Sequence, residues 1–191
     1  MIINDKALAK LMNHAKKNGG YRVAMTRGEP AWIYITYRNW YVGAQWDKLS
    51  AKIKGILTEH LGQYIQPGEA WHILKKSFQE EFYENVTEHI FELNTVAKTA
   101  VTKTLYPMVK PTPIMWRDTL VYRKTDGELL LMDPALMDMA AQLTWYPIQV
   151  NGWLFWDAGT EQLYIEPEDP NPGDVEFIKK IAALDWAPKE E

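Results

Sequence analysis

The stretch Asp126 to Pro167, DGELLLMDPALMDMAAQLTWYPIQVNGWLFWDAGTEQLYIEP, indicates the fold more clearly than any other part of the chain. It begins with an Asp-Gly turn and an apolar strand from Leu129 to Met132. A helix is predicted from Asp133 to Leu143, because Asp133 suits the N-cap and Pro134 suits the first helical turn. Three more strands are then predicted: Tyr146 to Val150, Trp153 to Trp156 and Gln162 to Ile165.

The N-terminus carries a looser copy of this unit. A helix capped by Asn4 or Asp5 is expected to run to about Lys17. A strand that begins at Tyr21 follows, and the β-rich stretch Ala31 to Val42 then supplies two more strands. We therefore predict an α+β protein with mainly antiparallel sheets and two related strand-helix-strand-strand units.

A pair of helices is predicted between the two units, over residues 47–84. The first has apolar residues at helical spacing and ends at Gly62. The second is expected to begin at Pro67, which suits a first turn, and to point Trp71 and Phe78 toward the core.

The proline-rich segment Pro107 to Pro113 is predicted to be a seam, because three prolines in seven residues do not fit a helix or a central strand. It would separate an N-terminal half, residues 1–106, from a C-terminal half, residues 114–191, as two small domains or as one compact domain. Just before it, residues 85–93 alternate like a strand, whereas residues 95–106 fit a helix or a strand.

The repeated unit resembles the β-α-β-β-β unit of DNA sliding clamps. The resemblance is carried by the strand-into-helix stretch DGELLLMDPALM, from Asp126 to Met137, and covers residues 126–167 well and residues 1–42 loosely. The two helices predicted over residues 47–84 do not fit it. The resemblance implies a role in DNA-replication processivity, or a protein that imitates such a factor.

Charge is distributed unevenly along the chain. Its net charge is −4, but residues 1–62 carry ten Lys/Arg and four Asp/Glu, whereas residues 113–191 carry six and fifteen. The two ends therefore face each other or face different partners. The absence of cysteine excludes disulfides, thiolate zinc sites and a cysteine nucleophile. No apolar run is long enough to span a bilayer, so we expect a cytoplasmic protein without a membrane partner.

Recognisable catalytic motifs are absent from the sequence, including Gly-rich phosphate loops and His-Glu-x-x-His. The four histidines lack the short spacing typical of metal ligands. The acids Asp157, Glu161 and Glu166 could form a divalent-metal site or an acid/base pair, although a solvated acidic rim explains them more simply. We predict a protein that is not an enzyme and uses no cofactor or metal, with a small-molecule enzyme as the third alternative.

Residues 22–54 combine cations with aromatic rings, which is the combination that a nucleic-acid strand needs. The alternative is a solvated basic face above an aromatic core, and the acidic character of the whole chain weakens binding to DNA. The candidate residues in this region are Arg38, Trp40, Lys48, Lys52 and Lys54.

The acidic C-terminal part suggests a different mode of binding, in which exposed aromatic side chains and carboxylates occupy a basic site of a partner protein. Its candidate residues are Trp153, Trp156, Asp157, Glu161, Tyr164 and Glu166. The chain is small, cysteine-free and rich in aromatic residues, and in this it resembles phage-encoded accessory proteins such as anti-CRISPR and other anti-defence proteins. The leading prediction is an inhibitor of a host protein that handles nucleic acid. Direct DNA binding in replication or recombination is the alternative.

Overall fold

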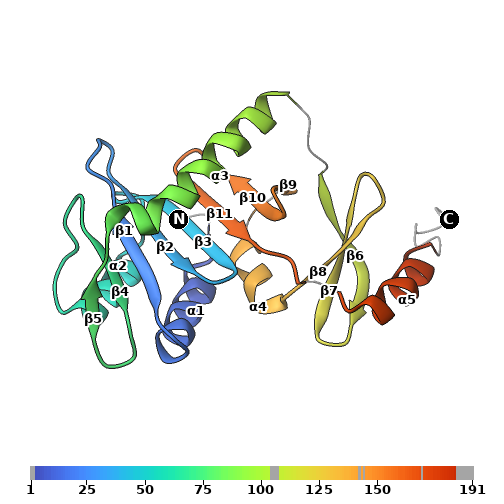
Figure 1. The fold of residues 1–191 in the computed structure, drawn as a ribbon, viewed down its shortest axis with the longest axis horizontal. Coiled ribbons are helices and arrows are strands. Elements are labelled where there is room, and N and C mark those ends of the chain that lie inside the picture. Colours follow the sequence, from blue (N-terminus) through green and yellow to red (C-terminus); the bar gives the residue numbers. More distant parts are fainter. Residues whose placement is uncertain (1–2, 104–107, 142, 144, 169, 184–191) are drawn as a thin grey trace.

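The computed structural model describes residues 3–103, 108–141, 143, 145–168 and 170–183. It has helices and antiparallel sheets, so the predicted α+β class is confirmed (Figure 1). The large sheet runs in the spatial order β5 (Phe78–Glu80), β4 (Ala70–Ile73), β1 (Tyr21–Met25), β2 (Trp32–Tyr37), β3 (Trp40–Gln45), β11 (Glu161–Ile165), β10 (Trp153–Asp157) and β9 (Ile148–Val150). The small sheet contains β6 (Val109–Trp116), β7 (Thr119–Lys124) and β8 (Leu129–Met132).

The helices are α1 (Asp5–Lys17), α2 (Ala51–Leu61), α3 (Tyr83–Lys103), α4 (Pro134–Met137) and α5 (Pro172–Ala182). A 3₁₀ turn, Asp138–Ala140, continues α4, so the helix expected as far as Leu143 is shorter than predicted. Within the described residues, no helix has the length and apolar character needed to cross a membrane.

The same order of elements occurs twice in the large sheet. α1 precedes β1, β2 and β3, and α4 precedes β9, β10 and β11. The last strand of each series, β3 and β11, pairs with the other in antiparallel fashion near the middle of the sheet. The backbone N–H of Asn4, at the start of α1, donates to the carbonyl oxygen of Met139, 3.0 Å away, next to α4. The two units therefore share one sheet and one apolar core.

The main core lies between the large sheet and the helices α1, α2 and α4. α1 begins where it does because the side chain of Asn4 accepts hydrogen bonds from the N–H groups of Lys6 and Ala7. Leu8 and Met12 then lie one turn apart and are completely buried. Burial of each such side chain stabilises the fold by about 1.5–3 kcal/mol.

α3 crosses the opposite face of the large sheet (Figure 1). It is anchored by two small apolar clusters, in which Val86 packs against β1 and β4, and Leu93 and Ala97 pack near β9, β10 and β11. Between them, Asn94 accepts a hydrogen bond from the buried hydroxyl of Tyr164. The sheet is therefore covered on both faces.

The second helix predicted over residues 47–84 is wrong, because residues 70–80 form the β4–β5 hairpin. Ala70 to Ile73 pair with the open edge of β1 and with β5, and this tertiary pairing overrides the local helix propensity of the segment. Phe78, expected in the core, is exposed. The first helix of the pair is present as α2, which begins after its N-cap Ser50 and ends at Gly62 in the left-handed conformation.

The strand predicted over residues 85–93 is also wrong, because these residues belong to α3. The buried positions Val86, Ile90, Leu93 and Ala97 follow the 3.6-residue period, which a window of nine residues did not reveal against the local alternation. The helix continues through residue 103, and residues 104–107 lie outside the described part.

The small sheet contains most of the predicted seam, because β6 begins at Val109, and it lies to one side of the large sheet together with α5 (Figure 1). Pro111 and Pro113 lie in β6, an edge strand, where a missing N–H group removes no central hydrogen bond. One face of the small sheet packs on α5 around Ile178, while Leu130 and Met132 of β8 reach the main core.

Candidate functional site

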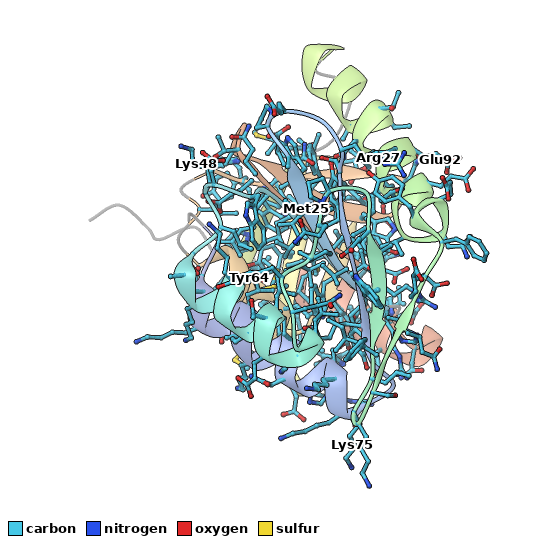
Figure 2. All side chains as sticks on the ribbon, turned by 90° about the vertical axis from the view of Figure 1, so that its left-hand side faces the viewer. Met25, Arg27, Lys48, Tyr64, Lys75 and Glu92 are labelled. Carbon is cyan, nitrogen blue, oxygen red and sulfur yellow. The ribbon has the colours of Figure 1, made fainter. Side chains whose placement is uncertain are left out.

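Six cationic side chains gather at one end of the large sheet, although they come from four separate segments. We call this surface the basic end; it consists of Lys16 and Lys17 at the end of α1, Arg22 in β1, Arg38 in the β2–β3 turn, and Lys75 and Lys76 in the β4–β5 turn. Figure 2 shows Lys75 at the opposite side of the molecule from Arg27 and Lys48.

The loops of the basic end are held together by hydrogen bonds to the α1–β1 connection. The Tyr37 hydroxyl donates to the carbonyl oxygen of Asn18, 3.1 Å away, and Arg38 Nη2 lies 3.5 Å from the same oxygen. Gly20 has φ +87°, and a Cβ atom there would lie 2.6 Å from the carbonyl oxygen of Ile73. Only glycine therefore allows β4 to approach this closely.

Two adjoining hollows, of about 280 and 150 Å³, open at this end between β1, β2 and the start of α3. We call them together the arginine cleft, because Arg22 and Arg38 line both. Both hollows also share Thr36 and Tyr37. The larger one reaches Tyr41, Asn85, Val86 and Ile90, and the smaller one reaches Gly19, Gly20, Tyr21 and His72.

The two arginines of the cleft differ in their partners. Arg22 Nε lies 3.2 Å from Glu81 Oε2, and this hydrogen bond is the main reason why the pKa of Glu81 lies below its usual value. The guanidinium of Arg38 lies 5.3 Å from the ring centre of Tyr37 and, within the described residues, has no carboxylate partner. Burial, followed by Glu166, raises the pKa of Tyr41, so this hydroxyl stays protonated.

Arg38 occupies an unfavourable backbone position. It lies in the two-residue turn between Tyr37 and Trp40 with φ +22°, a region that glycine adopts more easily than any other residue. Residues with strained backbone conformations are concentrated at binding and catalytic sites, where the position of the side chain is needed for function. The guanidinium of Arg38 is therefore the best candidate for a ligand contact in the cleft.

The structure separates the basic residues that the sequence places together. Lys48, Lys52 and Lys54 lie at the other end of the strands, with Lys48 beside Asp47 and Lys54 above the ring of Trp46 at 5.0 Å. Only Arg38 among the predicted basic candidates belongs to the basic end. Strand direction decides this, because a six-residue strand carries the chain about 20 Å from one end of the sheet to the other.

The predicted aromatic anchors are wrong. Trp40 is 1% exposed and lies in the main core, so it cannot stack on a ligand. Trp153 and Trp156 are buried on opposite faces of β10, because Trp153 stacks on Tyr41 under α3 and Trp156 faces the main core. Tyr164 is buried as well. A strand that is covered on both faces hides every aromatic residue that it carries.

Two of the three predicted acidic candidates stabilise the fold. Asp157 closes a turn by accepting from the N–H of Gly159 at 2.7 Å. Glu161 is 3% exposed and accepts from the N–H of Ile3 at 2.9 Å, which fixes the N-terminus against β11. Glu166 is exposed and lies beside Asn39, near the basic end. Within the described residues, no group of three or more His, Cys, Asp or Glu could hold a metal ion.

Lys16, Lys17, Lys75 and Lys76 were not recognised as site residues from the sequence. The two Lys-Lys pairs are visible there, but their meeting depends on a hairpin at residues 70–80 that sequence periodicity had indicated to be a helix. Comparison with protein-family models gave no match for this chain, and comparison with curated proteins gave none either.

Proposed function

We propose that this protein acts by binding a nucleic-acid strand at its basic end, with phosphate groups held in the arginine cleft. The observation that carries the proposal is a cleft lined by Arg22 and Arg38, at the end of the large sheet where α1 ends and the β4–β5 turn adds Lys75 and Lys76. Arginine side chains match phosphate oxygens with two parallel hydrogen bonds, and exposed lysines add contacts that release counterions.

The charge of the remaining surface supports binding at one place. The chain has a net charge of −4, so the surface outside the basic end is acidic on balance and repels a polyanion. A strand is therefore directed to the end where Lys17, Lys75 and Lys76 are exposed. The arginine cleft at this end would accept one or two backbone phosphates and leave the bases outside.

In this proposal the protein is a non-enzymatic accessory protein of a phage or mobile element that contacts DNA in replication or recombination. The repeated order of one helix and three strands supports the clamp-like version of this role. The second candidate is an inhibitor of a host protein that handles nucleic acid. It is favoured by the exposed carboxylates of Glu84, Glu88 and Glu92 on α3.

The test is fluorescence anisotropy of labelled single-stranded and double-stranded DNA, titrated with the full chain over a salt series. Lys75→Ala/Lys76→Ala and Lys48→Ala/Lys52→Ala remove the same charge from opposite ends of the sheet. We expect the first variant to lose roughly tenfold in affinity at low salt and the second about twofold or less. Equal losses would show that net charge alone governs binding, and no signal at low salt would refute the proposal.

A further inference from the structure

We infer that α3 carries a docking groove for a basic, amphipathic helical segment of a partner protein. The groove has a volume of about 780 Å³ and runs along the side of α3 that faces away from the arginine cleft. Phe91 and Val96 form its apolar part, and Glu84, Glu88 and Glu92 form its acidic rim. This surface is separate from the basic end and does not depend on nucleic-acid binding.

The acidic rim is a regular row. The three glutamates are exposed and follow one another at intervals of four residues, which places them about 6 Å apart along the helix axis. Within the described residues, none of them forms an ion pair. Figure 2 shows Glu92 at the outer edge of the molecule. Like charges at this spacing destabilise a helix by about 0.2–0.5 kcal/mol per pair, so the row costs stability in the free protein.

Two partly exposed aromatic rings, those of Phe82 and Phe91, lie near this row of glutamates. Phe91 is 40% exposed, although its ring is fixed edge-on against Tyr34 at 5.8 Å between ring centres. Phe82, just before α3, is 75% exposed. A fixed and partly exposed ring provides apolar contact area at little cost in conformational entropy, and such rings are enriched at protein interfaces.

Charge complementarity identifies the occupant. A partner helix with Lys or Arg at four-residue spacing would face the three glutamates, and its apolar residues would cover Phe91 and Val96. A nucleic-acid strand has the wrong sign for this groove. The competing occupant is a second copy of this chain that offers its basic end.

The probe is a fluorescent amphipathic helix of about 18 residues, with leucine on one face and lysine on the other, and a matched peptide with glutamate in place of lysine. We expect the lysine peptide to bind the full chain and the glutamate peptide not to bind. The variant Glu84→Lys/Glu88→Lys/Glu92→Lys should lose at least about tenfold in affinity. The control Glu29→Lys/Glu59→Lys/Glu176→Lys changes the same charge at exposed positions elsewhere, and it should stay within about threefold.

Three results would overturn the inference: no binding of the lysine peptide, equal losses in both triple variants, or a dimer of the free chain that the α3 variant dissociates. If the triple variant does not fold, Glu88→Gln replaces it, with an expected loss of about threefold and no loss in the control Glu59→Gln. DNA binding by the α3 variants tests the basic end in the same samples. Failure of the wild type to bind the lysine peptide would therefore contradict the docking groove, whereas failure to bind DNA would contradict the proposed role of the basic end.

Discussion

Arg38 holds its guanidinium at the arginine cleft from a backbone position that suits glycine, with φ +22°. We expect Arg38→Gly to raise the free energy of unfolding by about 0.5–1 kcal/mol, because relief of the left-handed strain exceeds the entropy that glycine loses. The same change should weaken DNA binding several-fold, because it removes the proposed phosphate contact. Urea denaturation and DNA anisotropy measure the two effects.

Arg117 provides the matched control, since it has φ +52° in the β6–β7 turn, outside the basic end. Its ion pair with Asp174, 3.2 Å long, is exposed on the arginine side and contributes little. Arg117→Gly should increase stability to a similar degree without a change in DNA affinity. A loss of stability in Arg38→Gly would contradict the assignment of strain.

His60 makes the stability of the fold sensitive to pH. Its Nδ1 lies 2.8 Å from the buried hydroxyl of Tyr21, and burial, followed by Lys16, lowers the pKa of the imidazole. The unfolded chain therefore binds a proton more readily than the native chain. The free energy of unfolding should fall as the pH drops through the unfolded histidine pKa near ~6.5, and the fall should end below the lower native pKa.

The measurement is a set of urea midpoints between about pH 7.5 and pH 5. His60→Gln keeps a polar partner for Tyr21 but cannot take up the proton, so its midpoints should depend less on pH. The exposed residue His14, on α1, serves as the control, since His14→Gln should retain the full pH dependence. Parallel profiles for the wild type and His60→Gln would refute the role of His60.

The two sides of α3 differ in burial and in charge. Its buried side follows the 3.6-residue period, while its exposed side repeats glutamate every four residues. We expect Glu88→Lys to stabilise the protein by roughly 1 kcal/mol, because it replaces two like-charge pairs with two opposite-charge pairs. The same variant should bind the lysine peptide more weakly.

Thermal unfolding and peptide anisotropy measure these opposite effects. If Glu88 served only to stabilise the fold, Glu88→Lys would lower stability. If Glu88 had no role in binding, the variant would bind the lysine peptide as the wild type does. Glu59→Lys on α2 is the control, since Glu59 is exposed and lies outside the groove. Its peptide affinity should stay close to that of the wild type.

The whole molecule separates its charges in space as well as along the chain. The basic end lies where the strands β2 and β4 finish, and the acidic groove lies on the outer flank of α3. If up to six cations contact phosphates, the slope of the logarithm of affinity against the logarithm of salt concentration should reach at most about −4 for single-stranded DNA. A salt series with the wild type measures this slope, and a slope near zero would exclude phosphate contacts as the source of affinity.

Several elements followed from local sequence alone. The N-cap Asn4 and the apolar face with Leu8 and Met12 specify α1, and the Asp133-Pro134 start specifies α4. The Asp126-Gly127 turn and the Asn151-Gly152 turn specify their hairpins, because both turns need residues that accept positive φ. These signals lie within a few residues of each other, so they do not depend on distant contacts.

Tertiary structure decided the region from Pro67 to Leu93 and, through it, the candidate site. Ala70 to Ile73 became a strand because the edge of β1 was open to them, and α3 became a helix because the sheet offered it a face to cover. The segments that carry Lys16, Arg38 and Lys75 come together only because the β2–β3 turn and β4 both contact the α1–β1 connection.

The sequence by itself determined the α+β class, the repeated order of one helix and three strands, and the turns, since each depends on short-range propensity and periodicity. The strand expected before each helix is not repeated, because β8 lies in the small sheet and no strand precedes α1 within the described residues. Only the tertiary structure decided which tryptophans are buried, which cations share a surface and which face of α3 is acidic. The physical reason is that burial and charge clustering depend on strand order and direction, which arise from pairings between residues far apart in the chain.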